Sequence, residues 1–164
     1  MRRAATVGVY GYTGETFLDA LLAAEVGILL DVRERRGVRG SQYAWANSAR
    51  LQAALAGAGI AYEHRKELAP TTELRQLQYL EDARLGVGKR SRSRLADEYV
   101  ERYTHEILDQ VDLEAILGHI PGDSVFALLC VERDPEACHR SLIAERLAGE
   151  HGISVVHLRP STMV

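Results

Sequence analysis

Short apolar runs alternate along this chain with segments in which apolar residues recur every three or four positions. The runs have the length and continuous hydrophobicity of buried strands, and they lie at residues 5–11, 28–33, 60–64, 124–130 and 153–158. The periodic segments are typical of helices, and they lie at residues 14–27, 47–59 and 138–152. This alternation predicts an α/β fold, a three-layer α/β/α sandwich with a mostly parallel sheet of about five strands.

Residues that favour helix ends indicate where these helices begin and stop. The first helix is expected to end at a Gly27 cap, and the last helix at Gly152. The second helix is expected to begin at Asn47, a good N-cap residue, and to end at Gly57 or Gly59.

The segment between the third and fourth strands, residues 68–120, has helical spacing with a Gly- and Arg-rich interruption. We therefore expect a helical insert before the fourth strand. The chain has 164 residues, which is long enough for one domain with a core and too short for two ordinary ones. We predict a single α/β domain over residues 1–164.

Composition narrows the class of protein. Apolar residues make up 46% of the chain and charged residues 26%, as in globular proteins. No apolar run approaches the roughly 18 residues of a membrane span, and the basic N-terminus precedes only a short apolar stretch that glycines interrupt. We expect a cytoplasmic protein without membrane contact, in which a structural disulfide is disfavoured. The formal net charge of -3 argues against a surface built throughout for nucleic acid.

Both cysteines of the chain lie where the predicted fourth strand meets the following helix. Cys130 ends the strand, Cys138, His139 and Arg140 begin the helix, and Glu132 lies between. A thiol at a helix N-terminus beside a histidine and an arginine has a lowered pKa, which predicts that Cys138 is a nucleophile or redox thiol. Arg140 would bind an anionic group, and Glu132 would act as acid or base or hold His139. Alternatively, both cysteines are buried core residues and His139 bonds a nearby carboxylate.

Two further strand ends carry residues that suit ligand binding. Gly11, Tyr12 and Thr13 follow the first strand in a tight turn, where the backbone can approach a ligand closely. Asp31 and Arg33 end the second strand and are expected to project to opposite faces, so that at most one points into a given pocket. Because ligands of open α/β sheets bind beyond the carboxyl ends of the strands, we predict that these residues converge on the cysteine-containing site. The alternative for Asp31 and Arg33 is a salt bridge with a helix.

A metal site would draw on the same cysteines. Cys130, Cys138 and His139 could supply three ligands, and His64 could supply a fourth from a neighbouring strand end. Their spacing matches no zinc finger and lacks the close cysteine pairs of structural zinc sites. We therefore predict no metal and no other cofactor.

Two loops are rich in arginine. Residues 33–39 carry four arginines close to Tyr43 and Trp45, and residues 84–94 combine glycines with lysine and arginine. Arginines mixed with aromatic side chains can stack on bases, so nucleic acid binding through Arg33–Arg39 and Arg84–Arg94 is one interpretation. The others are a lid over a small-molecule site for the first loop and a solvated connection between helices for the second.

The chain resembles the DUF488 family through two segments, LLDVRERRGVRGSQYAWANSARLQAALAGAGIAYEH and FALLCVERDPEACHRSLIAERLAGEHGISVVHL. The shared features are a glycine turn after the first strand, a DVR at the end of the second, and a C-x-E…C-H-R segment that joins a strand to a helix. The resemblance implies an α/β protein of a bacterial and archaeal group whose biochemical role is unassigned. It also implies a signature on Asp31, Arg33, Cys130, Glu132, Cys138, His139 and Arg140.

The first turn departs from the family pattern. Family members usually have glycine, histidine and serine there, and this chain has Gly11, Tyr12 and Thr13. If the histidine of the relatives is catalytic, then either Tyr12 substitutes for it in this chain or the activity of this chain has changed.

We favour a small cytoplasmic enzyme that binds an anionic, nucleotide-like ligand at the strand ends. The main alternative is a non-catalytic module that binds nucleic acid or a protein partner through the arginine loops. A rhodanese-like sulfurtransferase is a lesser alternative, because the acidic Glu132 and Asp134 disfavour a bound persulfide. The enzyme predicts a pocket with Cys138 exposed and Arg140 aimed inward, and the module predicts both arginine loops on one open face. The sequence does not fix the reaction or the oligomeric state.

Overall fold

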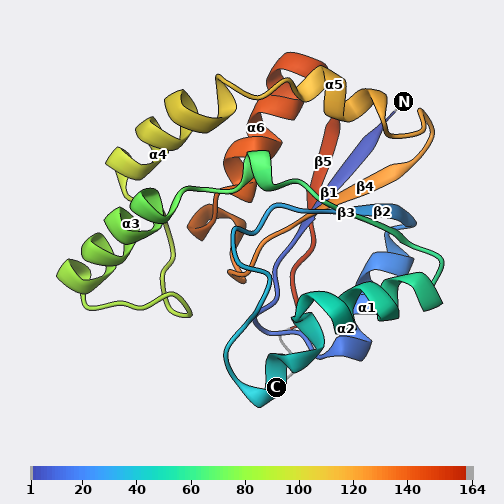
Figure 1. Cartoon of the computed structure of the whole chain (residues 1–164), viewed down its shortest axis with the longest axis horizontal. Coiled ribbons are helices and arrows are strands. Elements are labelled where there is room, and N and C mark those ends of the chain that lie inside the picture. Colours follow the sequence, from blue (N-terminus) through green and yellow to red (C-terminus); the bar gives the residue numbers. More distant parts are fainter. Residues whose placement is uncertain (1, 162–164) are drawn as a thin grey trace.

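A five-stranded sheet runs through the centre of the described protein (Figure 1). The structure is a computed structural model that describes residues 2–161. Every strand pairing within this range is parallel, so the predicted parallel sheet is confirmed. The strand order is β3-β2-β4-β1-β5, with β1 at Arg3–Val7, β2 at Val26–Asp31, β3 at Ala61–His64, β4 at Val125–Leu129 and β5 at Ser154–His157.

Helices cover both faces of the sheet, which confirms the expected three-layer arrangement (Figure 1). One face carries α1 (Gly14–Ala23) and α2 (Ser48–Gly57). The opposite face carries the helical insert, which consists of α3 (Thr72–Leu85), α4 (Asp97–Tyr103) and α5 (Leu113–Gly118), together with α6 (Arg140–His151). Short helical turns connect these elements: η1 Ser41–Ala46, η2 Lys66–Leu68, η3 Thr104–Leu108 and η4 Pro135–Ala137. Within residues 2–161, none of the helices combines the length and the apolar character needed to cross a membrane.

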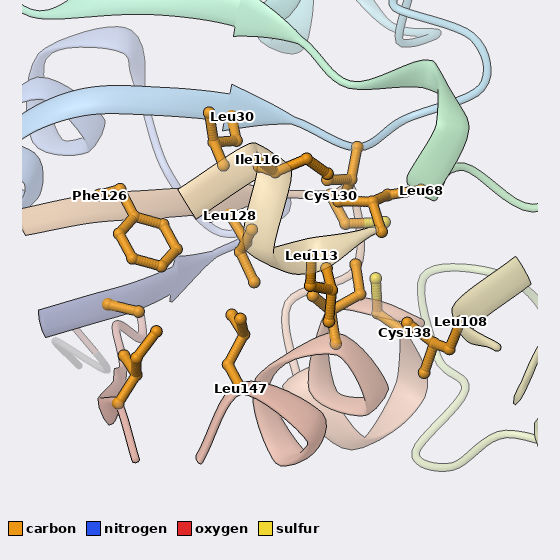
Figure 2. Packing of buried hydrophobic residues seen from close by; sticks show 14 of the residues in the cluster. Leu30, Leu68, Leu108, Leu113, Ile116, Phe126, Leu128, Cys130, Cys138 and Leu147 are labelled. Atoms are coloured by element: carbon orange, nitrogen blue, oxygen red, sulfur yellow. The ribbon is translucent and has the colours of Figure 1, made fainter. Parts of the chain in front are cut away.

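Each face of the sheet has its own hydrophobic core, because successive side chains of a strand point to opposite faces. In β4, Ala127 and Leu129 pack toward α1 and α2, whereas Phe126 and Leu128 pack toward the insert and α6. Continuous apolar sequence in this strand is therefore explained by burial on both sides. Figure 2 shows that Cys130 and Cys138 belong to the second of these cores and lie at the end of it away from Phe126.

The observed helix ends agree in part with those predicted from the sequence. Gly152 is the C-cap of α6 in the left-handed conformation, as expected. Asn47 is the N-cap residue of α2, but its side-chain oxygen accepts a hydrogen bond from the backbone of Val38 instead of capping the helix. The expected cap at Gly27 is wrong: α1 is capped at Ala24, and Gly27 lies inside β2.

The first strand ends at Val7, earlier than the apolar run that continues to Gly11. Its backbone nevertheless stays beside the chain that follows β4, since the amides of Val9 and Tyr10 both donate to the carbonyl oxygen of Val131. This bifurcated contact brings the turn after β1 against the segment that contains the candidate site.

Candidate functional site

A cavity of about 770 Å³ opens beyond the carboxyl ends of β2 and β4. Its floor contains Cys130, Glu132, Cys138 and His139, and its walls come from residues 33–39 and from segments of the helical insert. Both arginine-rich loops of the sequence therefore face the same cavity as the cysteines. Of the residues expected from the second strand end, Arg33 lines the same cavity as the cysteines and Asp31 does not.

His139 is the centre of the floor. Its Nε2 lies 2.8 Å from the carbonyl oxygen of Val32, and because a carbonyl only accepts, Nε2 carries a proton. Nδ1 points to both sulfur atoms, 3.5 Å from Sγ of Cys130 and 3.7 Å from Sγ of Cys138. A fourth side chain joins this group, since Oε2 of Glu132 lies 3.3 Å from Sγ of Cys130. We call Cys130, Cys138 and His139 the Cys/His cluster.

The environment separates the acidities of the two thiols. Burial raises the pKa of Cys130 well above its usual range, and a hydrogen bond with Cys138 raises it further. Burial acts in the same direction on Cys138, but a hydrogen bond from Cys130 and the charge of His139 outweigh it and bring its pKa well below the ordinary thiol range. Burial lowers the pKa of His139, but the charge of Cys138 and its hydrogen bond, together with the Val32 carbonyl and the charge of Glu132, outweigh this and raise it. Of the two thiols, Cys138 is thus the more acidic.

Glu132 is held by a buried ion network that reaches into the insert. Burial raises the pKa of this carboxyl group, the charge of Cys138 adds to that, and the positive charges of Lys89 and Arg92 act in the opposite direction. Arg92 donates to Glu132 at 3.2 Å and to the carbonyl oxygen of Ala137 at 3.0 Å. It also bonds both carboxylate oxygens of Asp82, at 3.1 and 3.0 Å. Arg92 therefore joins the basic loop to the floor of the cavity.

Basic side chains dominate the cavity wall. Seven of them line the cavity, against two acidic side chains. Three of the seven are paired with carboxylates: Arg33 with Asp31, Arg75 with Glu34, and Arg92 with Asp82 and Glu132. The other four form no salt bridge with any residue between 2 and 161, and they are Arg35, Arg39, Lys89 and Arg90. We call these four the unpaired cations.

Arg140 does not have the position that was expected for an anion-binding residue. It is fully buried and does not line the cavity. Its guanidinium donates to the carbonyl oxygens of Glu132 at 2.5 Å and Arg133 at 3.0 Å, and to the hydroxyl of Thr6 at 3.3 Å. From the start of α6 the side chain reaches Thr6 in β1, and it holds the turn between β4 and α6.

Asp31 and Arg33 also differ from the expectation. The expectation that they project to opposite faces is wrong, because residues two positions apart in an extended chain point to the same side. The two side chains form a buried salt bridge of 2.8 Å with each other. The hydroxyl of Tyr62 donates to the same carboxylate at 2.6 Å, and Arg33 also donates to the carbonyl oxygen of Ala46 at 2.9 Å. Arg33 reaches the cavity wall, whereas Asp31 does not line the cavity. The pair fixes the start of the first arginine loop.

The turn after β1 contributes less to the cavity than expected. Thr13 is the N-cap of α1, in a capping box with Thr16, and Gly11 takes a positive φ of 92° in the turn. Tyr12 is buried against Phe17, with its ring edge toward the ring of Phe17 at a centroid distance of 5.8 Å. None of the three lines the cavity, and the residue of this turn that does is Tyr10.

His64 is not part of the Cys/His cluster. His64 is the last residue of β3, and its Nε2 lies 3.0 Å from the carbonyl oxygen of Arg33, just after the end of β2. It does not line the cavity. The residues that sequence reasoning treated only as part of a loop are Lys89 and Arg92, which face the floor from the insert. No local sequence pattern marks Arg92. The structure places it beside Asp82, which also bonds Gln78 at 2.9 Å on the buried side of α3.

The fold and the cavity define a class: a parallel α/β protein with a cysteine–histidine cluster beneath a cationic cavity. A family model with the description "Domain of unknown function DUF488" matches residues 13–147, and the chain belongs to this family. Comparison with curated proteins and comparison with solved structures each gave no significant match.

Proposed function

We propose that the protein is a small enzyme that binds an anionic, nucleotide-like ligand in this cavity and acts on it at the cavity floor. The observation that carries the proposal is the position of the four unpaired cations, which line the same cavity as the Cys/His cluster. Positive charges without partners in a concave site attract an anion and increase its local concentration. Their carboxylate-bonded neighbours Arg33, Arg75 and Arg92 instead hold the walls in place.

The size and lining of the cavity support a ligand of nucleotide dimensions. A volume of about 770 Å³ falls within the range of small-molecule sites, which is roughly 300–1,000 Å³. Arginine and lysine side chains are the usual partners of phosphate groups. The rings of Tyr10 and Tyr79 also line the cavity, and each has a guanidinium over it, that of Arg90 at 5.2 Å and that of Arg75 at 5.8 Å from the ring centroid. Aromatic rings and guanidinium groups are the planar groups on which bases stack.

The floor supplies the reactive groups. Of the two acidic side chains that line the cavity, Glu34 is bonded to Thr72 and Arg75 at the wall, and Glu132 lies beside the Cys/His cluster. Glu132 is therefore the group for proton transfer to or from a bound ligand. The three members of the cluster contribute two sulfur atoms and one imidazole nitrogen within reach of the same ligand.

A module that binds a nucleic acid strand is less well supported. Residues 33–39 and 88–92 enclose a cavity together, whereas a strand needs an open basic face that follows its backbone. Two basic residues of the second loop lie outside the cavity in exposed ion pairs, Arg84 with Glu81 and Arg94 with Asp97. These two residues distinguish the two functions experimentally.

Calorimetric titration of the EDTA-treated, metal-free protein with inorganic pyrophosphate and with AMP tests the proposal. We expect saturable binding, and a loss of about tenfold or more in affinity for Arg35→Ala and for Lys89→Ala, because each removes a charged hydrogen-bond donor. Arg94→Ala is the matched control from the same basic loop, and it should bind as the wild type does. Bound pyrophosphate should also slow the alkylation of Cys138 by iodoacetamide, since the ligand lies above the floor.

Two results would contradict the proposal. One is the absence of binding for both probes. The other is tight, steeply salt-dependent binding of a single-stranded oligonucleotide that Arg94→Ala weakens as much as Lys89→Ala does. In that case the arginine loops act as a nucleic acid surface.

A further inference from the structure

We infer that Cys130, Cys138 and His139 form a three-ligand site for a thiophilic divalent metal ion of the zinc class, with its fourth position open to the cavity. The inference goes beyond the proposed function, because the ion can bind whether or not the anionic ligand does. It also gives Cys138 the role of a ligand in place of the nucleophile that the sequence predicted.

The distances within the cluster are those of a metal site. The three ligand atoms, two Sγ and one Nδ1, all lie within 4.8 Å of one another. Nδ1 of His139 is 3.5 Å from one sulfur and 3.7 Å from the other. A tetrahedral zinc ion with bonds of about 2.3 Å to sulfur and about 2.0 Å to nitrogen separates the nitrogen from each sulfur by about 3.5 Å and the two sulfurs by about 3.8 Å. An ion therefore fits between the three atoms with little movement of the side chains.

His139 is oriented as a metal ligand. Its Nε2 donates to the carbonyl oxygen of Val32 at 2.8 Å, so in the neutral ring the lone pair is on Nδ1 and points to the two sulfur atoms. Histidines that bind metals are usually held in this way, by a hydrogen bond from the other ring nitrogen to a carbonyl or carboxylate. The ring of Tyr103 packs against His139 with centroids 5.5 Å apart and restricts its rotation.

The donor atoms select the class of metal. Two thiolates and one imidazole suit zinc and related transition metals, whereas magnesium and calcium prefer oxygen ligands. All three residues are more than nine-tenths buried, yet all three line the cavity. Three protein ligands with one open position are the arrangement of catalytic zinc sites, in which the fourth ligand is water or substrate. An oxygen of the anionic ligand can take this position, and the ion then polarises it.

The structure also explains why the cluster is not evident from residue spacing. Cys130 lies just after β4, and η4 brings the chain back so that Cys138 and His139 face it. The ligands come from a strand end and from the turn before a helix, unlike the close cysteine pairs of zinc fingers.

Titration of the EDTA-treated protein with Co²⁺ tests the site, followed by displacement with Zn²⁺. We expect one Co²⁺ per chain, with a near-ultraviolet thiolate-to-metal band and the visible bands of tetrahedral cobalt, both removed by Zn²⁺. Cys130→Ser, Cys138→Ser and His139→Gln should each lose about 100-fold or more in affinity. His64→Gln is the matched control, because His64 also bonds a backbone carbonyl at a strand end and stands outside the cluster.

A second readout does not depend on the folding of the variants. In the wild-type protein, Zn²⁺ should protect Cys138, the more acidic of the two thiols, from iodoacetamide, and EDTA should restore its reactivity. The inference is overturned if the wild type shows no thiolate-to-cobalt band, or if His64→Gln loses binding as His139→Gln does. Pyrophosphate binding by the metal-free protein is measured separately, so failure of the metal site and failure of the anion site are distinguishable.

Discussion

The guanidinium of Arg140 donates to the main-chain carbonyl oxygen of Glu132 at 2.5 Å, and this bond ties the start of α6 to the turn that follows β4. The same side chain reaches the carbonyl oxygen of Arg133 and the hydroxyl of Thr6 in β1. The start of α6, the turn after β4 and the distant strand β1 therefore meet at one buried cation. Because Glu132 belongs to the cavity floor, the position of the floor depends on this cation.

Replacement of Arg140 by methionine should destabilise the fold. The variant keeps most of the side-chain volume but leaves the buried carbonyl oxygen of Glu132 and the partly buried one of Arg133 without this donor, which costs about 3 kcal/mol of unfolding free energy. Urea denaturation measures the loss. Arg140→Lys should recover only part of it, since one ammonium group cannot reproduce the planar fork. A variant of wild-type stability that no longer binds pyrophosphate would instead restore the anion-binding role expected from the sequence.

Gly8 lies against the hydrogen bond between Arg140 and Glu132, where there is no room for a larger residue. A Cβ atom on Gly8 would lie 2.0 Å from the carbonyl oxygen of Glu132 and 3.1 Å from an amino nitrogen of Arg140. We expect Gly8→Ala to displace the chain after β4 and to lower the unfolding free energy by about 2 kcal/mol or more. Gly27→Ala is the control within β2, where the nearest atom to the new Cβ is 3.9 Å away. Equal stability of the two variants in urea denaturation would show that the close approach at Gly8 is unimportant.

Arg92 should be more important for stability than its place in a glycine-rich loop suggests. Its side chain is 5% exposed, and its removal leaves the carboxylates of Asp82 and Glu132 buried without their cation. We expect Arg92→Met to lower the unfolding free energy by about 3–5 kcal/mol. Arg94→Ala, which breaks an exposed pair with Asp97, should lower it by about 1 kcal/mol or less. Similar small effects of both changes would argue that the loop is a solvated connection.

The stability of the protein should fall on mild acidification because of His157. The hydroxyl of Thr6 lies 2.7 Å from Nδ1 of this histidine. Burial lowers the pKa of His157, as do the charges of Arg140 and Arg159, against an opposite effect from Glu136 and Glu145. The folded-state pKa is thus below the unfolded value of about 6.5. The unfolded chain then binds more protons, so the contribution is present above that value and is lost as the pH falls through the folded pKa.

Thermal unfolding at a series of pH values between 8 and 5 measures this effect. The wild type should lose more stability across the interval than His157→Gln, which has no titrating group at this position. A slope that is the same in both proteins would assign the acid sensitivity to other groups. His105→Gln is the control, since His105 is an exposed histidine that pairs with Asp109 at a distance of 3.1 Å.

The sequence by itself determined the order of elements, the parallel sheet and the three layers. These depend on hydrophobic periodicity, which is a local property: β4 is apolar at every position because both of its faces are covered. It also brought Cys130, Glu132, Cys138 and His139 into one candidate site, since all four lie within one strand–turn–helix segment. Local periodicity misplaced the cap at Gly27, because β2 already begins at Val26, which pairs with Val125 of β4, and Gly27 lies at an irregularity inside the strand.

Only the tertiary structure decided which charged residues are paired and which are free. Arg140 and Arg92 looked alike in sequence to Arg35 and Lys89, but the first two meet buried oxygen atoms from distant segments and the last two meet none. A salt bridge or carbonyl contact is a short-range interaction between groups that folding brings together, and no local pattern encodes it. The same holds for the geometry of the Cys/His cluster, which follows from the path of η4. The residue types of the candidate site can therefore be read from a short stretch of sequence. Which of their atoms face the cavity and which are bonded elsewhere is decided by the fold.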